Sequence, residues 1–332
     1  MTCRAFLSFF LCLGMADVGR AEDLYFDSNG VKIHYVEEGS GEPVLLIHGF
    51  TADATMQWGV PGIRKALARE FRVIALDNRG HGKSGKPHDA GKYGLEMVED
   101  AVRLLDHLKI KKAHVVGYSM GAMITLKLAV IHPDRVLSIT LGGAGRMQEA
   151  SFAACDKLAD ALEKDGDLGP FIAEMIGPGE GKLTEQKIKL VNALIAWRND
   201  LKALAAVARG LRKLKVTEEE IKAIKVPTLA IVGAQDFIKA SVDDLKGLPG
   251  LKTIVIDKCD HLTAFFSPLF LESLTTFLKQ KQRVESGKSR SQIFTISPGI
   301  AALFCAPSAP HLAPPAASHC NARPNAASVW ST

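Results

Sequence analysis

The chain alternates short apolar runs rich in β-branched residues with longer segments of helical periodicity. Several short runs are continuously apolar, which is typical of strands covered on both faces. This alternation predicts an α/β fold with a mostly parallel central sheet flanked by helices. The predicted strands are residues 31–37, 43–48, 72–77, 113–118, 136–143, 228–233 and 252–257.

The alternation stops between Gly145 and Lys215, where no strand is predicted. Apolar residues there recur at spacings of four and three, which predicts a helix with a wide apolar face, inserted as a helical cap. Thr217 and Glu220 then match a capping box at the start of a short helix. We therefore expect a core of residues 22–145 and 216–284 that is interrupted by a cap of residues 146–215. The apolar face consists of Leu190, Leu194, Trp197, Leu201 and Leu204, broadened by Ile188, Val191 and Ile195.

The two ends of the chain differ from its body. Residues 1–21 combine Arg4, an apolar run and small residues at Ala16 and Ala21, which is the layout of a secretory signal peptide. The apolar run is too short to span a membrane, so a periplasmic or secreted protein without a stable membrane anchor is expected. The alternative is a buried or frayed amino-terminal segment. Residues 285–332 are rich in Ala, Pro and Ser without periodicity, which predicts a low-complexity, disordered tail.

Charge and cysteine content exclude several classes of protein. The formal net charge of +5 falls when the two ends are left out, and no basic stripe is interleaved with aromatic residues, so no nucleic-acid partner is expected. Of the six cysteines only Cys155 and Cys259 lie in the body. Export would permit a disulfide between them, but two free or buried thiols are favoured. No metal-ligand spacing occurs, so neither a metal nor another cofactor is expected.

The sequence GYSMG, residues 117–121, places Ser119 between Gly117 and Gly121 where a predicted strand gives way to helix-forming residues. A sharp strand-to-helix turn needs small residues at these two flanks, because side chains there would clash. The pattern therefore predicts a nucleophile elbow with Ser119 at its tip.

Two further residues would complete a serine nucleophile's machinery, which needs a base and a carboxylate that orients the base. Asp236 and His261 each follow a predicted strand, and the chain order Ser, Asp, His is that of α/β-hydrolases. Asp243, Asp257 and Asp260 remain alternatives for the carboxylate. For the base the alternatives are His88 and His107, in a loop and a helix, and His311 and His319, in the tail.

Donors for an oxyanion are predicted in the stretch that follows the strand at residues 43–48. His48 and Gly49 form a tight turn that can direct the Phe50 N–H toward the pocket, beside the Met120 N–H. The alternative is a turn without catalytic use.

Together the motifs HGF, DNRGHGKS, GYSMG, GAQD and DH resemble the α/β-hydrolase fold superfamily, in its serine esterase, lipase and perhydrolase-like branch. In the DNRGHGKS loop the resemblance implies structural roles for Asp77 and Arg79, and a pocket-shaping, non-catalytic role for His81. It implies hydrolysis of small-molecule carboxylic esters through an acyl-enzyme. Serine at the elbow disfavours dehalogenases and epoxide hydrolases, which use aspartate there. Lactonase, carbon–carbon bond hydrolase and cofactor-free perhydrolase or haloperoxidase activities are alternatives, and so is a ligand-binding receptor without catalysis.

The cap is expected to select short to medium acyl chains. Substrate contacts are assigned to Trp58, Phe171 and Trp197, and the sequence leaves the oligomeric state open. Further apolar cap candidates are Phe152, Ile172, Met175 and Ile176, for which burial between cap and sheet is the alternative.

Overall fold

The computed structural model describes residues 22–169, 171–172 and 184–285. The predicted signal peptide, the cap candidates Met175 and Ile176, and the predicted tail beyond Glu285 lie outside these residues. Export and tail disorder therefore stay predictions.

The core is an eight-stranded sheet in the order β1-β2-β4-β3-β5-β6-β7-β8. β2 pairs antiparallel with β1 and β4, and the pairs from β4 through β8 are all parallel. The predicted mostly parallel sheet is confirmed, and every predicted strand is present; only β1 was not predicted. The strands are β1 (Leu24–Ser28), β2 (Val31–Glu38), β3 (Glu42–Ile47), β4 (Phe71–Leu76), β5 (Ala113–Tyr118), β6 (Val136–Gly142), β7 (Thr228–Gly233) and β8 (Lys252–Ile256).

Helices cover both faces of the sheet, which explains why its strands β5, β6 and β7 are buried along nearly all of their length. Along β3, Leu45 and Ile47 belong to one buried cluster and Val44 and Leu46 to another, because successive side chains of a strand point to opposite faces. The Leu45 face carries α3 (Leu95–His107) and α4 (Met120–Ile131), and the Val44 face carries α2 (Ile63–Leu67) and α11 (Pro268–Glu285).

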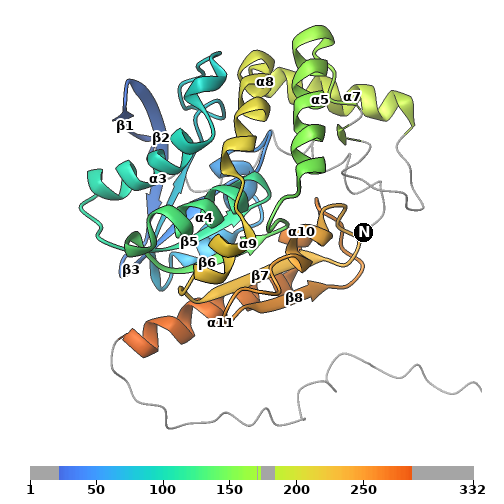
Figure 1. Ribbon diagram of the computed structural model, residues 1–332. Helices are drawn as coiled ribbons and strands as arrows, with labels where there is room; N and C mark the ends of the chain where they lie inside the picture. The colour runs from blue at the N-terminus through green and yellow to red at the C-terminus, as the bar shows by residue number, and fades with distance from the viewer. Residues whose placement is uncertain (1–21, 170, 173–183, 286–332) are drawn as a thin grey trace, which may run out of the picture. The chain divides into compact units, whose positions relative to one another are not determined.

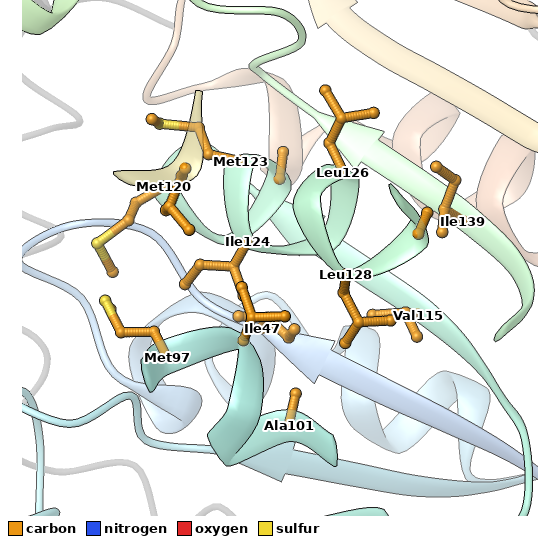
Figure 2. Close-up of a cluster of buried hydrophobic side chains, with 14 of the residues drawn as sticks. Ile47, Met97, Ala101, Val115, Met120, Met123, Ile124, Leu126, Leu128 and Ile139 are labelled. Atoms are coloured by element: carbon orange, nitrogen blue, oxygen red, sulfur yellow. The ribbon is translucent and has the colours of Figure 1, made fainter. Parts of the chain in front are cut away.

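The helix α4 begins directly after the elbow and anchors it. Figure 2 shows Ile124 and Leu128 of α4 beside Ile47 of β3 and Val115 of β5, with Met97 of α3 reaching the same cluster. These side chains are almost completely buried. The packing fixes α4 against the strands that carry the site.

The remaining elements are short. None of the helices in the described residues is long and apolar enough to span a bilayer. The predicted capping box is confirmed, with Thr217 and Glu220 bonded reciprocally at the start of α9. The short elements are η1 (Thr55–Gly59), η2 (Ala90–Lys92), η3 (Pro133–Arg135), η4 (Leu211–Leu214), α9 (Glu218–Ala223), α10 (Lys239–Asp243) and η5 (Ala264–Phe266).

The segment where a cap was expected forms helices, among them α5 (Glu149–Asp165), α7 (Glu185–Arg198) and α8 (Leu201–Gly210), which gather on one side of the sheet (Figure 1). The prediction of a single helix through residues 190–204 is wrong. The helix is interrupted at Asn199 and Asp200. There the Asp200 carboxylate accepts a hydrogen bond from the Ala203 N–H at 3.0 Å and caps α8. Local capping outweighs the continuous apolar periodicity there.

Asp77, directly after β4, organises the loop that follows it. Its carboxylate is buried and accepts hydrogen bonds from the Ala54 N–H and the Lys83 N–H, each at 2.8 Å. The buried His34 ring contacts the same carboxylate at 2.8 Å through Nδ1. Burial alone would raise the Asp77 pKa, but these hydrogen bonds and His34 lower it to about 2. Burial would lower the pKa of His34, but its bonds to Asp77 and Asp23 raise it.

The His34–Asp77 pair predicts a pH-dependent stability. Because the His34 pKa is raised, its contribution is complete below its unfolded value of about 6.5 and is lost as pH rises through the folded value. The Asp77 contribution is complete above about pH 4 and is lost as pH falls toward 2. We expect His34→Gln to cost about 1–3 kcal/mol of unfolding free energy near pH 5 and less near pH 9. Urea unfolding of both proteins measures this; an equal cost at both pH values contradicts it.

Candidate active site

The turn around Ser119 can be built only with glycine at its two flanks. Ser119 lies between β5 and α4 with φ 55° and ψ −119°, a backbone region that non-glycine residues rarely adopt. A Cβ on Gly117 would lie 2.1 Å from the Gly121 carbonyl oxygen, and a Cβ on Gly121 would lie 2.1 Å from that of Ile47. The two glycines let strand, turn and helix approach closely and leave the serine at the tip.

The predicted partners of Ser119 lie within hydrogen-bond distance of one another. His261 Nε2 is 2.9 Å from Ser119 Oγ, and His261 Nδ1 is 2.9 Å from Asp236 Oδ2. Asp236 follows β7 and His261 follows β8, and both are nearly buried. The geometry allows the imidazole to accept the serine proton while the carboxylate orients the ring and stabilises its charged form.

The alternative carboxylates and histidines have other partners. Asp260 accepts hydrogen bonds from the N–H groups of Leu262 and Thr263 and so stabilises its own turn. Asp243 pairs with Lys239 on α10, and Asp257 is exposed. Among the histidines, His88 pairs with Asp200 at 2.9 Å and His107 stacks on Phe26, while His311 and His319 lie outside the described residues. Of the candidates that lie in the described residues, only His261 bonds to Ser119, and only Asp236 bonds to the other ring nitrogen of His261.

The loop after β3 lies against Ser119 and carries an oriented amide. A Cβ on Gly49 would lie 3.2 Å from the Ser119 Cβ. The Asn78 N–H donates to His48 Nε2 at 2.9 Å, so the proton of the neutral ring is on Nδ1, which donates to the Gly49 carbonyl at 2.8 Å. Burial lowers the His48 pKa and favours this neutral form. Because the Gly49 C=O and the Phe50 N–H share one planar peptide, the bond also fixes the direction of the Phe50 N–H.

The two amides expected to hold an oxyanion are available as donors. Within the described part of the chain, the N–H groups of Phe50 and Met120 donate to no protein acceptor. Met120 opens α4, so its N–H lies at the positive end of the helix dipole. Both amides flank the Ser119 turn and are suited to bind a developing negative charge.

The DNRGHGKS loop supports this arrangement from buried positions. Arg79 donates to both oxygens of the buried Asp100 carboxylate, at 2.7 and 2.6 Å. The His81 ring packs edge-on against His48 and Phe50, with ring centroids 5.2 and 5.9 Å apart. Burial, aided by nearby His48, lowers the His81 pKa to about 3, so this ring is neutral. His81 therefore packs against the loop of His48 and Phe50 and is itself completely buried.

Of the three residues assigned to substrate contact, only Phe171 packs against a residue of the candidate site. The Phe171 ring packs edge-on against the Phe50 ring, 5.7 Å away, and is partly exposed. The assignment of Trp58 is wrong, because this side chain is fully buried in the core with Ile63 and Leu67. The assignment of Trp197 is also wrong: it is 81% exposed, because α7 packs through Val191 and Ile195 on its other face.

Two aromatic residues beside the histidine were not predicted. The Phe237 ring packs edge-on against the His261 ring at 5.0 Å, and the Tyr118 hydroxyl donates to the His261 carbonyl at 2.7 Å. Each neighbours a predicted catalytic residue in sequence, Asp236 and Ser119 respectively. That adjacency was their only sequence signal.

Comparison with known proteins agrees with the fold. The model of the alpha/beta hydrolase fold family matches residues 42–166. A hydrolase of 2-hydroxy-6-oxo-6-(2'-aminophenyl)hexa-2,4-dienoic acid from Metapseudomonas resinovorans is 31% identical over 64% of this chain and 74% of its own length. The chain belongs to the α/β hydrolase fold family.

Other similar proteins differ in their chemistry. The dihydrolipoyllysine-residue acetyltransferase component of an acetoin cleaving system from Pseudomonas putida is 44% identical over 67% of this chain, and this chain spans only 59% of that protein. Among solved structures, a thermophilic esterase from Thermogutta terrifontis aligns with 79% of this chain and 99% of its own, with a TM-score of 0.63 and 25% identity. Membership of this family therefore establishes the fold of the chain, whereas the reactions of its relatives differ.

Proposed function

We propose that this protein is a serine hydrolase that cleaves carboxylic esters of short to medium acyl chain through an acyl-enzyme intermediate. The observation that carries the proposal is the continuous Ser119–His261–Asp236 hydrogen-bond chain beside two amides, those of Phe50 and Met120, that donate to no acceptor in the described residues. Ser119 Oγ attacks the ester carbonyl while His261 Nε2 takes its proton. The oxyanion binds to the N–H groups of Phe50 and Met120.

The same groups complete the acylation and then carry out the deacylation. Protonated His261 donates to the leaving alcohol, and the tetrahedral intermediate collapses to an ester on Ser119. Water then enters, His261 accepts its proton, and attack on the acyl group releases the carboxylic acid and the free Ser119 hydroxyl. Asp236 remains a carboxylate throughout and stabilises the imidazolium.

The acyl chain is expected to lie near the Phe50–Phe171 contact, which adjoins the apolar cap cluster of Leu168 and Ile172. Each buried methylene contributes roughly 0.8 kcal/mol, so butyrate should be preferred over acetate severalfold until the chain outgrows the pocket.

Phe171→Ala tests this placement, with Trp197→Ala as a matched aromatic control on the exposed face of the cap. We expect Phe171→Ala to change the ratio of kcat/KM for butyrate to that for acetate by about three- to tenfold, because it removes apolar surface beside Phe50. Trp197→Ala should leave the ratio unchanged. The measurement is kcat/KM for p-nitrophenyl esters from acetate to palmitate. An optimum at palmitate, or equal effects of both variants, would rule out this pocket.

Similarity to the hydrolase of a 6-oxo-dienoic acid favours a second candidate, hydrolysis of a carbon–carbon bond by the same triad. The discriminating measurement is turnover of that dienoic acid and of p-nitrophenyl butyrate by the same preparation. A higher kcat/KM for the dienoic acid would favour carbon–carbon hydrolysis. A receptor would show saturable ligand binding with no turnover of either compound.

A further inference from the structure

The side chain of Tyr118 links two parts of the site that the sheet keeps apart. Tyr118 ends β5, directly before Ser119, whereas His261 follows β8. In the sheet, β6 and β7 lie between these two strands. The Tyr118 hydroxyl nevertheless donates to the His261 backbone carbonyl at 2.7 Å, and both residues are buried.

Two glycines at the end of β6 make room for this crossing. A Cβ on Gly142 would lie 2.6 Å from Tyr118 Cδ2. Gly143 has φ +65°, and a Cβ there would lie 2.9 Å from Tyr118 Cζ and 3.1 Å from His261 Cε1. A side chain at either position would therefore displace the tyrosine ring, and one at Gly143 would also crowd the histidine.

The ring of Tyr118 is fixed independently of its hydroxyl. It packs against Phe265 at 5.1 Å and against Phe270 at 5.9 Å, and it tilts against the His261 ring at 5.4 Å. Phe237 contacts the His261 ring as well. Removal of the hydroxyl alone would thus leave the aromatic packing in place and free only the His261 carbonyl.

We propose that Tyr118 is a positioning residue for the general base: its hydroxyl ties the backbone of His261 to the strand that carries Ser119. This bond keeps His261 where its Nε2 lies 2.9 Å from Ser119 Oγ. Tyr118 does not touch the reacting atoms through its hydroxyl and transfers no proton. The proposal rests on the proposed function of Ser119 and His261. It goes beyond that function by naming the bond that keeps the two side chains within hydrogen-bond distance.

The expected effect is on the chemical step and not on substrate binding. Without the hydroxyl, the loop of His261 samples positions in which the imidazole is too far from Ser119 to accept its proton. A misplacement of this kind lowers the rate of attack, because proton transfer requires hydrogen-bond distance. We expect Tyr118→Phe to lower kcat about tenfold and to leave KM within about twofold.

Tyr93 supplies a matched control within the same chain. It too is fully buried, and its hydroxyl donates to a backbone carbonyl, that of Pro87, at 2.5 Å. Tyr93→Phe removes an equivalent bond in a loop that holds none of the proposed catalytic groups. Its loss of stability should resemble that of Tyr118→Phe, whereas its kcat should stay that of the wild type.

The experiment compares the wild type, Tyr118→Phe, Tyr93→Phe and Ser119→Ala. It measures kcat and KM for p-nitrophenyl butyrate, the rate of inactivation by a fluorophosphonate, and Tm, with kinetics taken well below the lowest Tm. Both kcat and the inactivation rate should fall about tenfold in Tyr118→Phe alone, because both depend on His261 activating Ser119. Wild-type values in Tyr118→Phe, or an equal fall in Tyr93→Phe, would overturn the proposal. Full activity of Ser119→Ala would instead refute the proposed function.

Discussion

Ser119→Ala should lower kcat/KM for p-nitrophenyl butyrate by about 10⁴- to 10⁶-fold while the protein remains folded. The substitution removes only Oγ, whose partner is His261 Nε2 at 2.9 Å. The remaining amides of Phe50 and Met120 can still polarise a bound ester, so activity above the uncatalysed rate should persist. Substrate binding, measured with an unreactive ester analogue, should survive.

A pair of aspartate variants sharpens this prediction. Asp236→Asn removes the charge that faces His261 Nδ1 and should cost about 10⁴-fold in kcat, because the amide favours the wrong tautomer of the ring. Asp243→Asn makes the same chemical change in a residue that pairs with Lys239 on α10, and should leave kcat unchanged. Equal losses in both variants would show that Asp236 has no special role.

The second large effect concerns folding. Gly121→Ala places a Cβ 2.1 Å from the Ile47 carbonyl oxygen, and neither backbone can retreat because α4 and β3 are packed in the core. We expect the unfolding free energy to fall by at least about 3 kcal/mol, or the protein to be insoluble.

The control for this prediction is Gly247→Ala. A Cβ on Gly247 would come no closer than 3.7 Å to its neighbours, so the same substitution should change stability by less than about 1 kcal/mol. Urea unfolding and soluble yield compare the two variants. A Gly121→Ala protein with wild-type stability would contradict the interpretation that the turn at Ser119 has no room for a side chain at residue 121.

The sequence predicted those features that depend on residues close together in the chain. Strand ends, the flanking glycines of Ser119 and the order of Asp236 and His261 follow from short motifs. β1 was missed because only Phe26 and Ser28 of its residues are buried, too few for a strand signal. The break between α7 and α8 was missed because apolar spacing continues across Asp200.

Contacts between distant residues had no comparable signal. Trp58 and Trp197 are both aromatic and were both assigned to substrate contact, yet Trp58 is fully buried and Trp197 is 81% exposed. Which face a helix buries depends on what packs against it, and one sequence does not reveal that. The Tyr118–His261 bond joins residues 143 positions apart and depends on the glycines at the end of β6.

The proposed mechanism requires Ser119 to carry the acyl group from the first half-reaction to the second. Acid quenching during turnover of p-nitrophenyl butyrate, followed by proteolysis and mass spectrometry, tests it directly. We expect one butyryl group on the peptide that contains Ser119. This group should be absent in Ser119→Ala, and its level should rise in His261→Ala if that variant slows deacylation more than acylation. Turnover by the wild type with no acylated peptide at any quench time, or a butyryl group on another residue that persists in Ser119→Ala, would contradict it.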